Sequence, residues 1–455
     1  MAGELKDRLT DLAHHTPSGT PPPDLWTRGV RRRRASQAVT SVLVAALVLI
    51  LGVGVWTWHT SRQGVTPVAP HGAVHFPDQF FTPSPWLHAF DGPPGQLVAI
   101  GTTEHKSLLR TRDDVYGITA STGEYGFLDL PHLADRPDYA NSVPPSLSPD
   151  GRSAAFWVTG TPSGAANTEL YGQTITGVAI YDATTGRVRV AQLPTTHGLA
   201  PESLTWSDSQ TVVMSVGQIM SGDGTQRSTT WNDVHLVAWR LEDDRATPLD
   251  VPPGLDASDE ITGGHGFVLA GGSGDGHRWL VWPRQPARDR SIRTRAGTAP
   301  PVASPGATAL AGVRGNRNPN SLIAGPILPG SGHVAMRAVN DSRQYYRPIA
   351  WTDDNHVVAL VRNPWHNNPG SITARIDLVD VDTGSARTMV SDQPGGGNAW
   401  AALSFATDLL TAPSARASAP PDPWDRRGVA IGLMLGFGLL GGLLLMEWRL
   451  RGRRA

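Results

Sequence analysis

Residues 147–158 read LSPDGRSAAFWV, and residues 178–188 read VAIYDATTGRV. The first stretch leads from a Ser-Pro-Asp-Gly turn into an apolar strand, and the second leads from an apolar strand into a Thr-Thr-Gly turn. Glycine accepts the positive φ that a hairpin turn requires. Together the two stretches predict consecutive antiparallel strands joined by tight turns.

Both patterns recur along the chain. The second is repeated without a gap by IDLVDVDTG at residues 376–384, and more weakly by YGITASTGE at residues 116–124. The first is repeated by WSDSQTVVM at residues 206–214 and by WTDDNHVVAL at residues 351–360, where a polar turn again leads into a β-branched strand. A recurring order of turn, strand, loop, strand and turn predicts a repeat architecture.

The candidate second turns set the size of the repeat. They fall near Gly123, Gly186, Asp243, Ala287, Asp341 and Gly384. Their spacings of 43 to 63 residues lie close to the roughly 40–50 residues of a four-stranded propeller blade with loop insertions. Six blades are favoured, seven are the next choice, and a pair of β-sandwiches is the structural alternative. Residues 400–405 (WAALSF) supply a late strand that can complete the first blade and remove an exposed sheet edge.

The Ser-Pro-Asp-Gly stretch also carries a resemblance to known proteins. Residues 147–188 resemble TolB-like and WD-repeat β-propellers, in which Ser-Pro-Asp-Gly followed by an apolar strand is a blade signature. The copies near residues 206 and 351 are degenerate, and residues 264–340 are difficult to divide into strands. The resemblance implies an all-β propeller.

Two apolar segments are long enough to span a bilayer. Residues 38–58 (AVTSVLVAALVLILGVGVWTW) contain 21 residues without a charge, and residues 428–446 contain 19. At about 1.5 Å of rise per residue, each suits a hydrocarbon core of roughly 30 Å. Arginine runs precede the first segment and follow the second, and such flanks stay in the cytosol. We therefore expect a two-pass protein of the cell membrane, with residues 1–37 and 447–455 in the cytosol and residues 59–427 outside.

Each apolar segment has an alternative interpretation. The first would be a cleaved signal peptide, but a polar leader of more than 30 residues precedes it and no small-x-small cleavage site follows Trp58. The second would be a buried core helix, but it stands behind a Pro/Ala/Ser-rich linker. Its pairs Gly432/Gly436 and Gly438/Gly442 have the spacing that lets membrane helices approach closely, so packing of the two spans against each other is an open possibility.

The composition excludes several classes of protein. The chain has 455 residues, of which 39% are hydrophobic and 17% charged, a net charge of -1 and no cysteine. This excludes a disordered chain, a disulfide-stapled mini-protein and a globally basic nucleic-acid binder. Two long apolar segments are too few for a polytopic transporter. Anionic lipid explains the basic ends of the chain, so we expect no nucleic-acid partner.

No set of residues has the spacing of a known catalytic or cofactor site. The lack of cysteine removes thiol catalysis and thiolate metal sites, and neither a phosphate-binding loop nor a His-Glu-x-x-His motif occurs. Residues 263–266 (GGHG) and 271–277 (GGSGDGH) look superficially like a hydrolase oxyanion loop and serine elbow. Asp275 stands where the elbow needs its second glycine, so two glycine-rich blade turns are the better interpretation. We expect a non-enzyme without cofactor or metal.

Two further features are candidate contact sites or turns. Trp365 stands in a polar loop and is a candidate partner-binding residue, because aromatic side chains are favoured at recognition sites. A surface loop with one tucked tryptophan is the plainer interpretation. Asp150, Asp223 and Asp275 each precede glycine, which indicates turns and not a calcium-binding loop.

The N-terminal segment contains an amphipathic pattern. Leu5, Leu9 and Leu12 stand at i, i+4 and i+7 and form one apolar stripe on a short helix. Such a helix is marginal alone in water, so the stripe needs lipid, another copy of the chain or a cytosolic protein to cover it. Asp7 and Asp11 are repelled by anionic lipid, which favours a protein partner.

The leader and the two-pass arrangement look like those of propeller-bearing membrane proteins of high-G+C Gram-positive bacteria, some of which are thought to act with extracytoplasmic-function sigma factors. An excess of arginine over lysine (37 against 2) fits GC-rich coding, although the chain lacks the cysteines of zinc-binding anti-sigma proteins. We predict a non-catalytic binding or sensing protein whose outer propeller regulates a cytosolic partner such as a sigma factor. The alternative is an envelope scaffold that binds protein or cell-wall polymer.

Overall fold

The computed structural model describes most of the central part of the chain. The described residues are 73–108, 110–134, 143–168, 173–220, 231–249, 261–271, 278–283, 290–293, 299–314, 321–327, 334–339, 343–362, 374–391 and 403–421, with residues 10, 11, 432, 436, 438, 441, 442 and 446. The predicted span 38–58 and most of the predicted span 428–446 lie outside them. Over the ranges just given, no helix has both the length and the apolar character needed to cross a bilayer.

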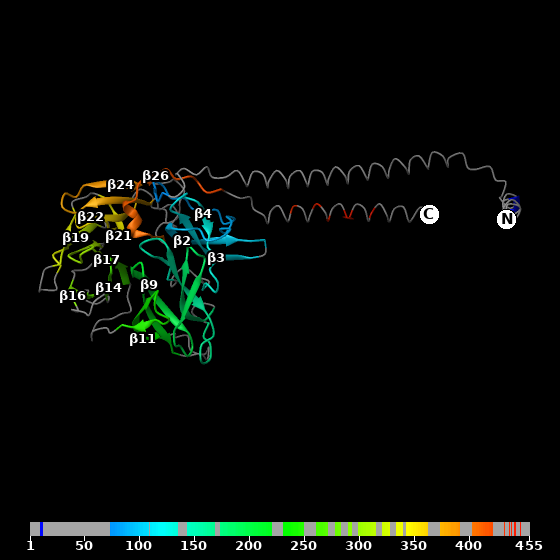
Figure 1. Cartoon of the computed structure of the whole chain (residues 1–455), viewed down its shortest axis with the longest axis horizontal. Coiled ribbons are helices and arrows are strands. Elements are labelled where there is room, and N and C mark those ends of the chain that lie inside the picture. Colours follow the sequence, from blue (N-terminus) through cyan, green and yellow to red (C-terminus); the bar gives the residue numbers. More distant parts are fainter. Residues whose placement is uncertain are drawn as a thin grey trace. The chain divides into compact units, whose positions relative to one another are not determined.

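Four-stranded antiparallel sheets make up the folded body (Figure 1). Five of them are each built from four consecutive strands. The first contains β5 (Ser146–Leu147), β6 (Ser153–Thr159), β7 (Ile175–Asp182) and β8 (Val188–Gln192). The second contains β9 (Leu199–Asp208), β10 (Thr211–Ile219), β11 (Trp231–Arg240) and β12 (Thr247–Pro248). The third contains β13 (Ile261–Gly264), β14 (Phe267–Gly271), β15 (Arg278–Pro283) and β16 (Arg290–Arg293). The fourth contains β17 (Ala299–Ala303), β18 (Ala309–Arg314), β19 (Ser321–Pro326) and β20 (Arg337–Ala338). The fifth contains β21 (Tyr345–Trp351), β22 (His356–Arg362), β23 (Ala374–Asp380) and β24 (Ala386–Val390).

A further sheet, which we call the composite sheet, takes its strands from both ends of the folded body. Its order is β25 (Ser404–Phe405), β2 (Leu97–Lys106), β3 (Thr111–Thr119) and β4 (Tyr125–Phe127). β25 pairs antiparallel with β2, which places Phe405 opposite Ala99 and Ser404 opposite Ile100. The late strand expected within residues 400–405 therefore completes this sheet. Beside it, β1 (Phe76–Pro77) and β26 (Ser414–Ala415) pair in parallel, and the 3-10 helix η2 (Thr407–Thr411) lies between β25 and β26 in the sequence.

Buried side chains join each sheet to the next. One hydrophobic cluster connects the composite sheet with the sheets β5–β8 and β21–β24. Four further clusters connect β5–β8 to β9–β12, β9–β12 to β13–β16, β13–β16 to β17–β20, and β17–β20 to β21–β24. In Figure 1 the colours likewise run from blue and cyan through green and yellow to orange strands that lie beside the blue ones. The fold is an all-β propeller, which excludes the alternative of two β-sandwiches.

The number of uninterrupted blades differs from the prediction. Blades of four consecutive strands number five within the described residues, whereas six or seven blades were expected. The sheet that comes first in the sequence has no first strand of its own, because the residues before β2 form β1 and a loop instead. β25, from the other end of the folded body, occupies that edge.

Each blade has two ends. The end that holds the turns between first and second strands, such as residues 148–152, and between third and fourth strands is called the turn end here. The end that holds the connections between second and third strands, such as residues 107–110, is called the loop end. Gly123, Gly186 and Gly384 close third-to-fourth turns with φ of 69°, 73° and 71°, so the hairpin glycines predicted from the repeats are confirmed.

Candidate functional site

The first strands of the six four-stranded sheets converge on one cavity of about 200 Å³. Its walls come from β5, β9, β13, β17, β21 and β25, which are the innermost strands of the propeller. First strands face the axis of a propeller, so this cavity is the central channel. Because every sheet contributes to it, the channel is the place where the whole fold can contact a single ligand.

One guanidinium lies among otherwise uncharged walls. Of the residues that line the channel, all of them described, Arg347 on β21 alone is charged. Its Nη2 donates a hydrogen bond of 2.7 Å to the carbonyl oxygen of Leu403, and this bond holds the side chain toward β25. An arginine side chain keeps its charge at every physiological pH and presents a planar set of donors, which suits a carboxylate or phosphate.

Two hydroxyl groups of the channel hold neighbouring first strands together. Ser404 Oγ accepts a hydrogen bond of 2.9 Å from the Leu147 amide and so ties β25 to β5. Thr262 Oγ1 donates a bond of 2.5 Å to the Pro301 carbonyl and ties β13 to β17. These bonds tie neighbouring innermost strands to each other, and the Arg347 charge is the most specific chemical feature of the channel.

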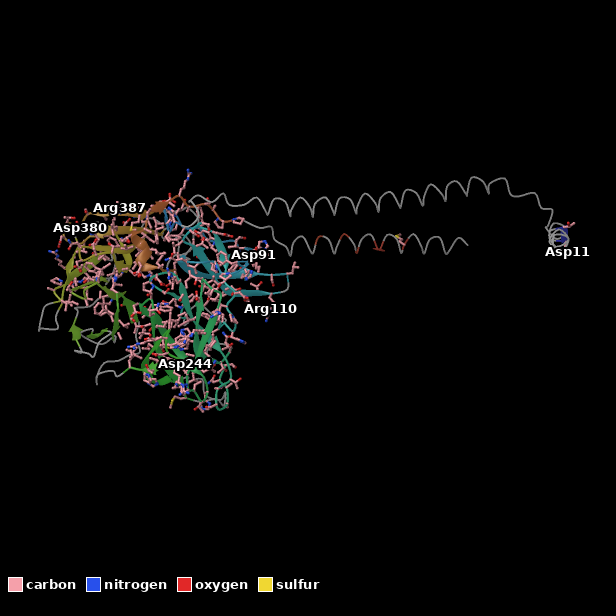
Figure 2. All side chains as sticks on the ribbon, in the orientation of Figure 1. Asp11, Asp91, Arg110, Asp244, Asp380 and Arg387 are labelled. Atoms are coloured by element: carbon pink, nitrogen blue, oxygen red, sulfur yellow. The ribbon has the colours of Figure 1, made fainter. Side chains whose placement is uncertain are left out.

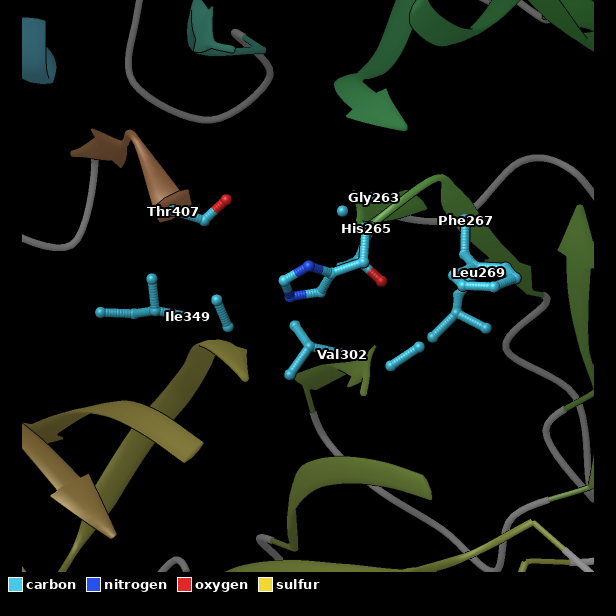
Figure 3. A pocket seen from close by; sticks show the side chains of 11 residues that line it. Gly263, His265, Phe267, Leu269, Val302, Ile349 and Thr407 are labelled. Atoms are coloured by element: carbon cyan, nitrogen blue, oxygen red, sulfur yellow. The ribbon is translucent and has the colours of Figure 1, made fainter. Parts of the chain in front are cut away.

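His265 lies across the turn end of the channel. It occupies the turn between β13 and β14 with a φ of 53°, a conformation uncommon for a residue with a side chain. Its ring points toward the axis between Thr407, Ile349 and Val302 (Figure 3). Its Nε2 lies 3.0 Å from the Trp351 carbonyl oxygen and donates to it, so the ring bridges two sheets that are not neighbours in sequence. The remaining cavity around the ring is about 10 Å³, roughly the space of one water.

Acidic groups stand close to His265. Burial raises the pKa of the Asp408 carboxyl, nearby His265 opposes that shift, and Asp150 adds to it. The Asp408 amide donates a hydrogen bond of 3.0 Å to the Pro149 carbonyl, which brings η2 against the Ser-Pro-Asp-Gly turn. The turn end of the channel thus holds an imidazole, with the carboxyl groups of Asp408 and Asp150 near it but not among the lining residues, whereas the walls hold the guanidinium.

Asp150 itself forms a turn. Its Oδ1 accepts hydrogen bonds of 2.7 Å from Ser148 Oγ and 3.1 Å from the Arg152 amide, as the Asp-Gly sequence predicted. Among the residues with described positions, no group of three or more His, Cys, Asp or Glu side chains gathers as metal ligands would. Asp223 and Asp275 lie outside those positions.

The residues of GGHG at 263–266 form a hairpin turn between β13 and β14, in agreement with the blade-turn interpretation. The second glycine-rich run continues beyond the described residues after Gly271, so the structure does not place its serine. The partner-binding candidates Leu5, Leu9, Leu12 and Trp365 also lie outside the described residues.

Sequence reasoning missed Arg347 and gave His265 a different role. Arg347 stands in YYRPIAW, residues 345–351, a strand that ends in the Trp-Thr-Asp-Asp turn already recognised as a blade motif. Arg347, Pro348 and Ile349 all line the channel, where the register of β21 against β22 is irregular. A charged residue in a first strand, two positions before a channel-facing Ile, was the available signal.

Comparison with known proteins adds likenesses of fold. No protein-family model matches the chain, and no curated protein sequence matches it. TolB from Acinetobacter baumannii is similar at 12% identity and a TM-score of 0.40, over 68% of this chain and 66% of that one. A putative TolB from Agrobacterium tumefaciens is similar at 14% identity and a TM-score of 0.30, over 67% and 91%. Dipeptidyl peptidase 4 from Porphyromonas gingivalis is similar at 12% identity and a TM-score of 0.36, over 64% and 44%. The chain thus spans slightly less than two thirds of the Acinetobacter protein.

Proposed function

We propose that this chain is a membrane-anchored β-propeller that binds an anionic group of an envelope ligand or protein in its central channel and does so without catalysis. One observation carries the proposal: six first strands converge on a cavity whose single charged wall residue is Arg347. A carboxylate or phosphate that enters a partly desolvated channel gains a charge-assisted hydrogen bond to the guanidinium. The proposal includes the composite sheet as a sixth blade, since it shares a hydrophobic cluster with both of its neighbours.

The proposed location is the outer side of a bacterial membrane. The arginine runs next to residues 38–58 and 428–446 favour two spans with cytosolic ends, and the arginine excess fits a high-G+C Gram-positive source. Protease added to intact spheroplasts is expected to digest the propeller and to spare epitope tags at both ends. Digestion of both tags would contradict this topology.

The channel is tested by photo-crosslinking in living cells. A photoreactive residue at Thr205, on the channel wall, is expected to give an adduct of defined mass. The yield should fall at least about tenfold with Arg347→Gln, because removal of one partner of a desolvated charge pair costs several kcal/mol. Arg347→Lys keeps the charge without the planar donors and should give an intermediate yield.

A matched position controls for chance contacts. Glu124 is exposed in the turn between β3 and β4, away from the channel walls, and the same photoreactive residue there should not give the adduct. Equal adducts from Thr205 and Glu124, or an adduct at Thr205 that Arg347→Gln leaves unchanged, would exclude the channel as the binding site. Melting of the Arg347 variants must match that of the unmodified chain, since Arg347 also bonds Leu403.

The regulatory half of the proposal rests on the leucine stripe. We propose that Leu5, Leu9 and Leu12 dock on a cytosolic protein, because burial of each leucine contributes roughly 1.5–3 kcal/mol and offsets the ordering of a short helix. Replacement of all three by serine should abolish a cytosolic cross-link while adducts at Thr205 persist. If only lipid contact changes, the cytosolic partner is excluded, and the chain acts as an envelope scaffold.

A further inference from the structure

We propose that the central channel is a blind pocket for an apolar carboxylate, whose anionic group binds Arg347 while its apolar group fills the space between Arg347 and His265. This inference rests on the channel binding proposed above and deepens it, since it names the class of ligand and the end by which the ligand enters. It depends on the closure of one end of the channel, on the order of the residues along its axis and on the chemistry of its walls.

His265 closes the turn end of the channel. Its ring crosses the axis (Figure 3), and its Nε2 donates a hydrogen bond of 3.0 Å to the Trp351 carbonyl oxygen. The amide of Gly266, the next residue, donates a bond of 2.6 Å to the Ser207 carbonyl oxygen, which ties the same turn to β9. The cavity left around the ring is about 10 Å³, which holds roughly one water. A ligand therefore reaches Arg347 from the loop end.

Arg347 lies nearer the loop end than the residues around His265. β21 runs toward the turn end, so Arg347 comes before Ile349 and Trp351 along the axis. At about 3.4 Å per residue, the four residues from Arg347 to Trp351 span roughly 13 Å. The guanidinium bonds the Leu403 carbonyl oxygen, and Leu403 precedes β25, which also runs toward the turn end because it pairs antiparallel with β2. We call the space between this guanidinium and His265 the floor of the channel.

The floor is mainly apolar. The large side chains that line it are Trp206, Val302, Ile349 and Phe405. The Trp206 indole Nε1 donates a hydrogen bond of 2.9 Å to the Ser146 carbonyl oxygen, so the polar atom of this ring is already engaged. Walls of this kind favour the burial of hydrocarbon over the burial of polar groups.

The charges favour a single carboxylate at the level of Arg347. A guanidinium can bind both oxygens of one carboxylate, and Arg347 is the one charged residue among the lining residues, all of which the structure describes. Four of those residues are prolines, which have no N–H for the further oxygens of a phosphate: Pro144, Pro145, Pro149 and Pro348. The carboxyl groups of Asp150 and Asp408 near His265 oppose an anion in the floor. The anionic group therefore stays at Arg347, and the apolar group enters the floor.

Other charged side chains lie on the outside of the propeller. Figure 2 labels Asp244, which is exposed in the turn between β11 and β12, and Arg387, which is exposed on the outer strand β24. Exposed charges of this kind pair weakly because water competes for them. Arg347 is half-buried, so a carboxylate in the channel meets its charge with less competing water.

The size of the channel restricts the ligand to the end of a molecule. The volume of about 200 Å³ is below the roughly 300–1,000 Å³ of pockets that enclose drug-sized ligands. Because the turn end is closed, a polymer cannot pass through, and only a terminus can enter. The C-terminal residue of a peptide and a free apolar acid both have the required chemistry, and the probes below distinguish them.

Binding of a defined peptide to the full chain in non-ionic detergent tests the chemistry. The probe is a fluorescent glycine–serine peptide that ends in leucine, prepared with a free carboxylate and with an amide. The acid should bind at least about tenfold more tightly, because the amide removes one partner of a desolvated charge pair. Serine in place of the last leucine should weaken binding about tenfold or more, because the floor then buries no large apolar group. Arg347→Gln should make the acid and the amide bind alike.

Octanoate identifies the source of the carboxylate, with octanol as the uncharged control. Binding of the peptide acid that octanoate does not displace assigns the channel to protein C-termini. Binding of octanoate, measured by calorimetry, without binding of the peptide acid assigns it to free apolar acids. Equal binding of the peptide acid and the amide, equal binding of octanoate and octanol, or no binding of any of these probes would overturn the proposal.

A single thiol tests the closure of the turn end. The chain has no cysteine, so Thr205→Cys places one thiol on the channel wall. With the acid bound, this thiol should be protected from a charged methanethiosulfonate reagent, and His265→Gly should restore its reaction. Glycine accepts the φ of 53° and removes only the ring. Ala307→Gly is the matched control, because Ala307 has a φ of 48° in the turn between β17 and β18 and does not line the channel. Protection that survives His265→Gly would show that the ring does not close this end.

Failure of this inference and failure of the channel proposal are distinguishable. An adduct at Thr205 in cells that depends on Arg347, without binding of the peptide acid or octanoate to the purified chain, retains channel binding and excludes the apolar carboxylate. Loss of the dependence on Arg347 excludes the channel proposal and, with it, the ligand class inferred here.

Discussion

Gly151, in the Ser-Pro-Asp-Gly turn, shows how one residue fixes both a turn and a contact between sheets. Its φ is 71°, which a side chain disfavours, and a Cβ at this position would overlap the carbonyl oxygen of Leu97. That contact is close because the Leu97 amide donates a hydrogen bond of 2.8 Å to the Gly151 carbonyl. The sequence predicted the turn from its glycine, but it gave no sign that β2 packs against it, since that contact depends on the closed ring.

Substitution of glycine by alanine separates the two roles. Gly123 has a similar φ of 69° but open space around its Cβ position, so Gly123→Ala should cost only the roughly 1–2 kcal/mol of a left-handed backbone. Gly151→Ala should cost distinctly more, about 3 kcal/mol or above, because the strand must also move. Thermal melting of the full chain in detergent compares them. Equal losses of stability in the two variants would show that β2 can shift at this contact without a further cost in free energy.

The stability of the turn between β7 and β8 depends on pH through the carboxyl group of Asp182. Burial alone would raise the pKa of this carboxyl, but hydrogen bonds from Thr184 and Thr185 outweigh burial and lower the pKa. A folded-state pKa below the unfolded value of about 3.9 adds stability above that value, and this stability is lost as the pH falls through the folded pKa.

Asp182→Asn is therefore expected to lower the stability at pH 7 by roughly 0.5–1.5 kcal/mol. At pH values below the folded-state pKa the difference should vanish, because the wild-type carboxyl is then neutral as well. Urea unfolding of the unmodified chain and of Asp182→Asn between pH 2 and 7 gives the free energy of unfolding of each as a function of pH. Parallel curves over the whole range would show that the carboxylate charge contributes nothing to the turn.

At the scale of the element, the turn from first to second strand recurs with different residues. Ser148 Oγ accepts a bond of 2.9 Å from the Ser153 amide, and Ser304 Oγ accepts bonds of 3.1 Å from the amides of Thr308 and Ala309. The first turn was evident from Ser-Pro-Asp-Gly. The second was missed because it reads Ser-Pro-Gly-Ala-Thr and places Ala307, not glycine, at a φ of 48°. The buried hydroxyl is the shared feature, and glycine is not.

The shared hydroxyl predicts similar losses from both turns. Ser148 and Ser304 are fully buried, so replacement of either by alanine leaves buried amides without their acceptor and should cost about 1–3 kcal/mol. Ser163→Ala is the control, because that hydroxyl is exposed and bonds the Thr195 carbonyl. Its loss should stay near 0.5 kcal/mol. A loss from Ser304→Ala as small as that of the control would mean that the turn is held by its backbone alone.

At the scale of the whole molecule, the propeller fold could be predicted because each repeat is encoded by a short, continuous stretch of sequence. The closure of the ring could be predicted only in part, because it pairs strands from the two ends of the folded body. Strand order, turn glycines and the late strand followed from short patterns. The pairing of β1 with β26 involves two residues on each side and has no periodic signature, so no sequence pattern marked it. The channel site could not be predicted for the same reason. The strands that surround Arg347 are far apart in the sequence and meet only in the folded ring.

Closure through β25 gives the last prediction. Phe405 is buried, lies opposite Ala99 in the composite sheet and has its ring 5.7 Å from that of Phe80. Phe156, in an uninterrupted blade, is as well buried but does not join the two ends of the domain. Alanine at either position should cost about 3–5 kcal/mol. The two substitutions are expected to differ in which strands separate first, since only Phe405→Ala weakens the sheet that joins the two ends of the ring.

Limited proteolysis of the full chain below its melting temperature distinguishes them. Phe405→Ala should expose new cleavage sites within residues 73–100 and 403–421, because the first and last strands of the ring open together before the other blades unfold. Phe156→Ala should lower the melting temperature without that pattern. Identical fragments from both variants would show that the ring opens everywhere at once, and that the composite sheet is no weaker a joint than any other.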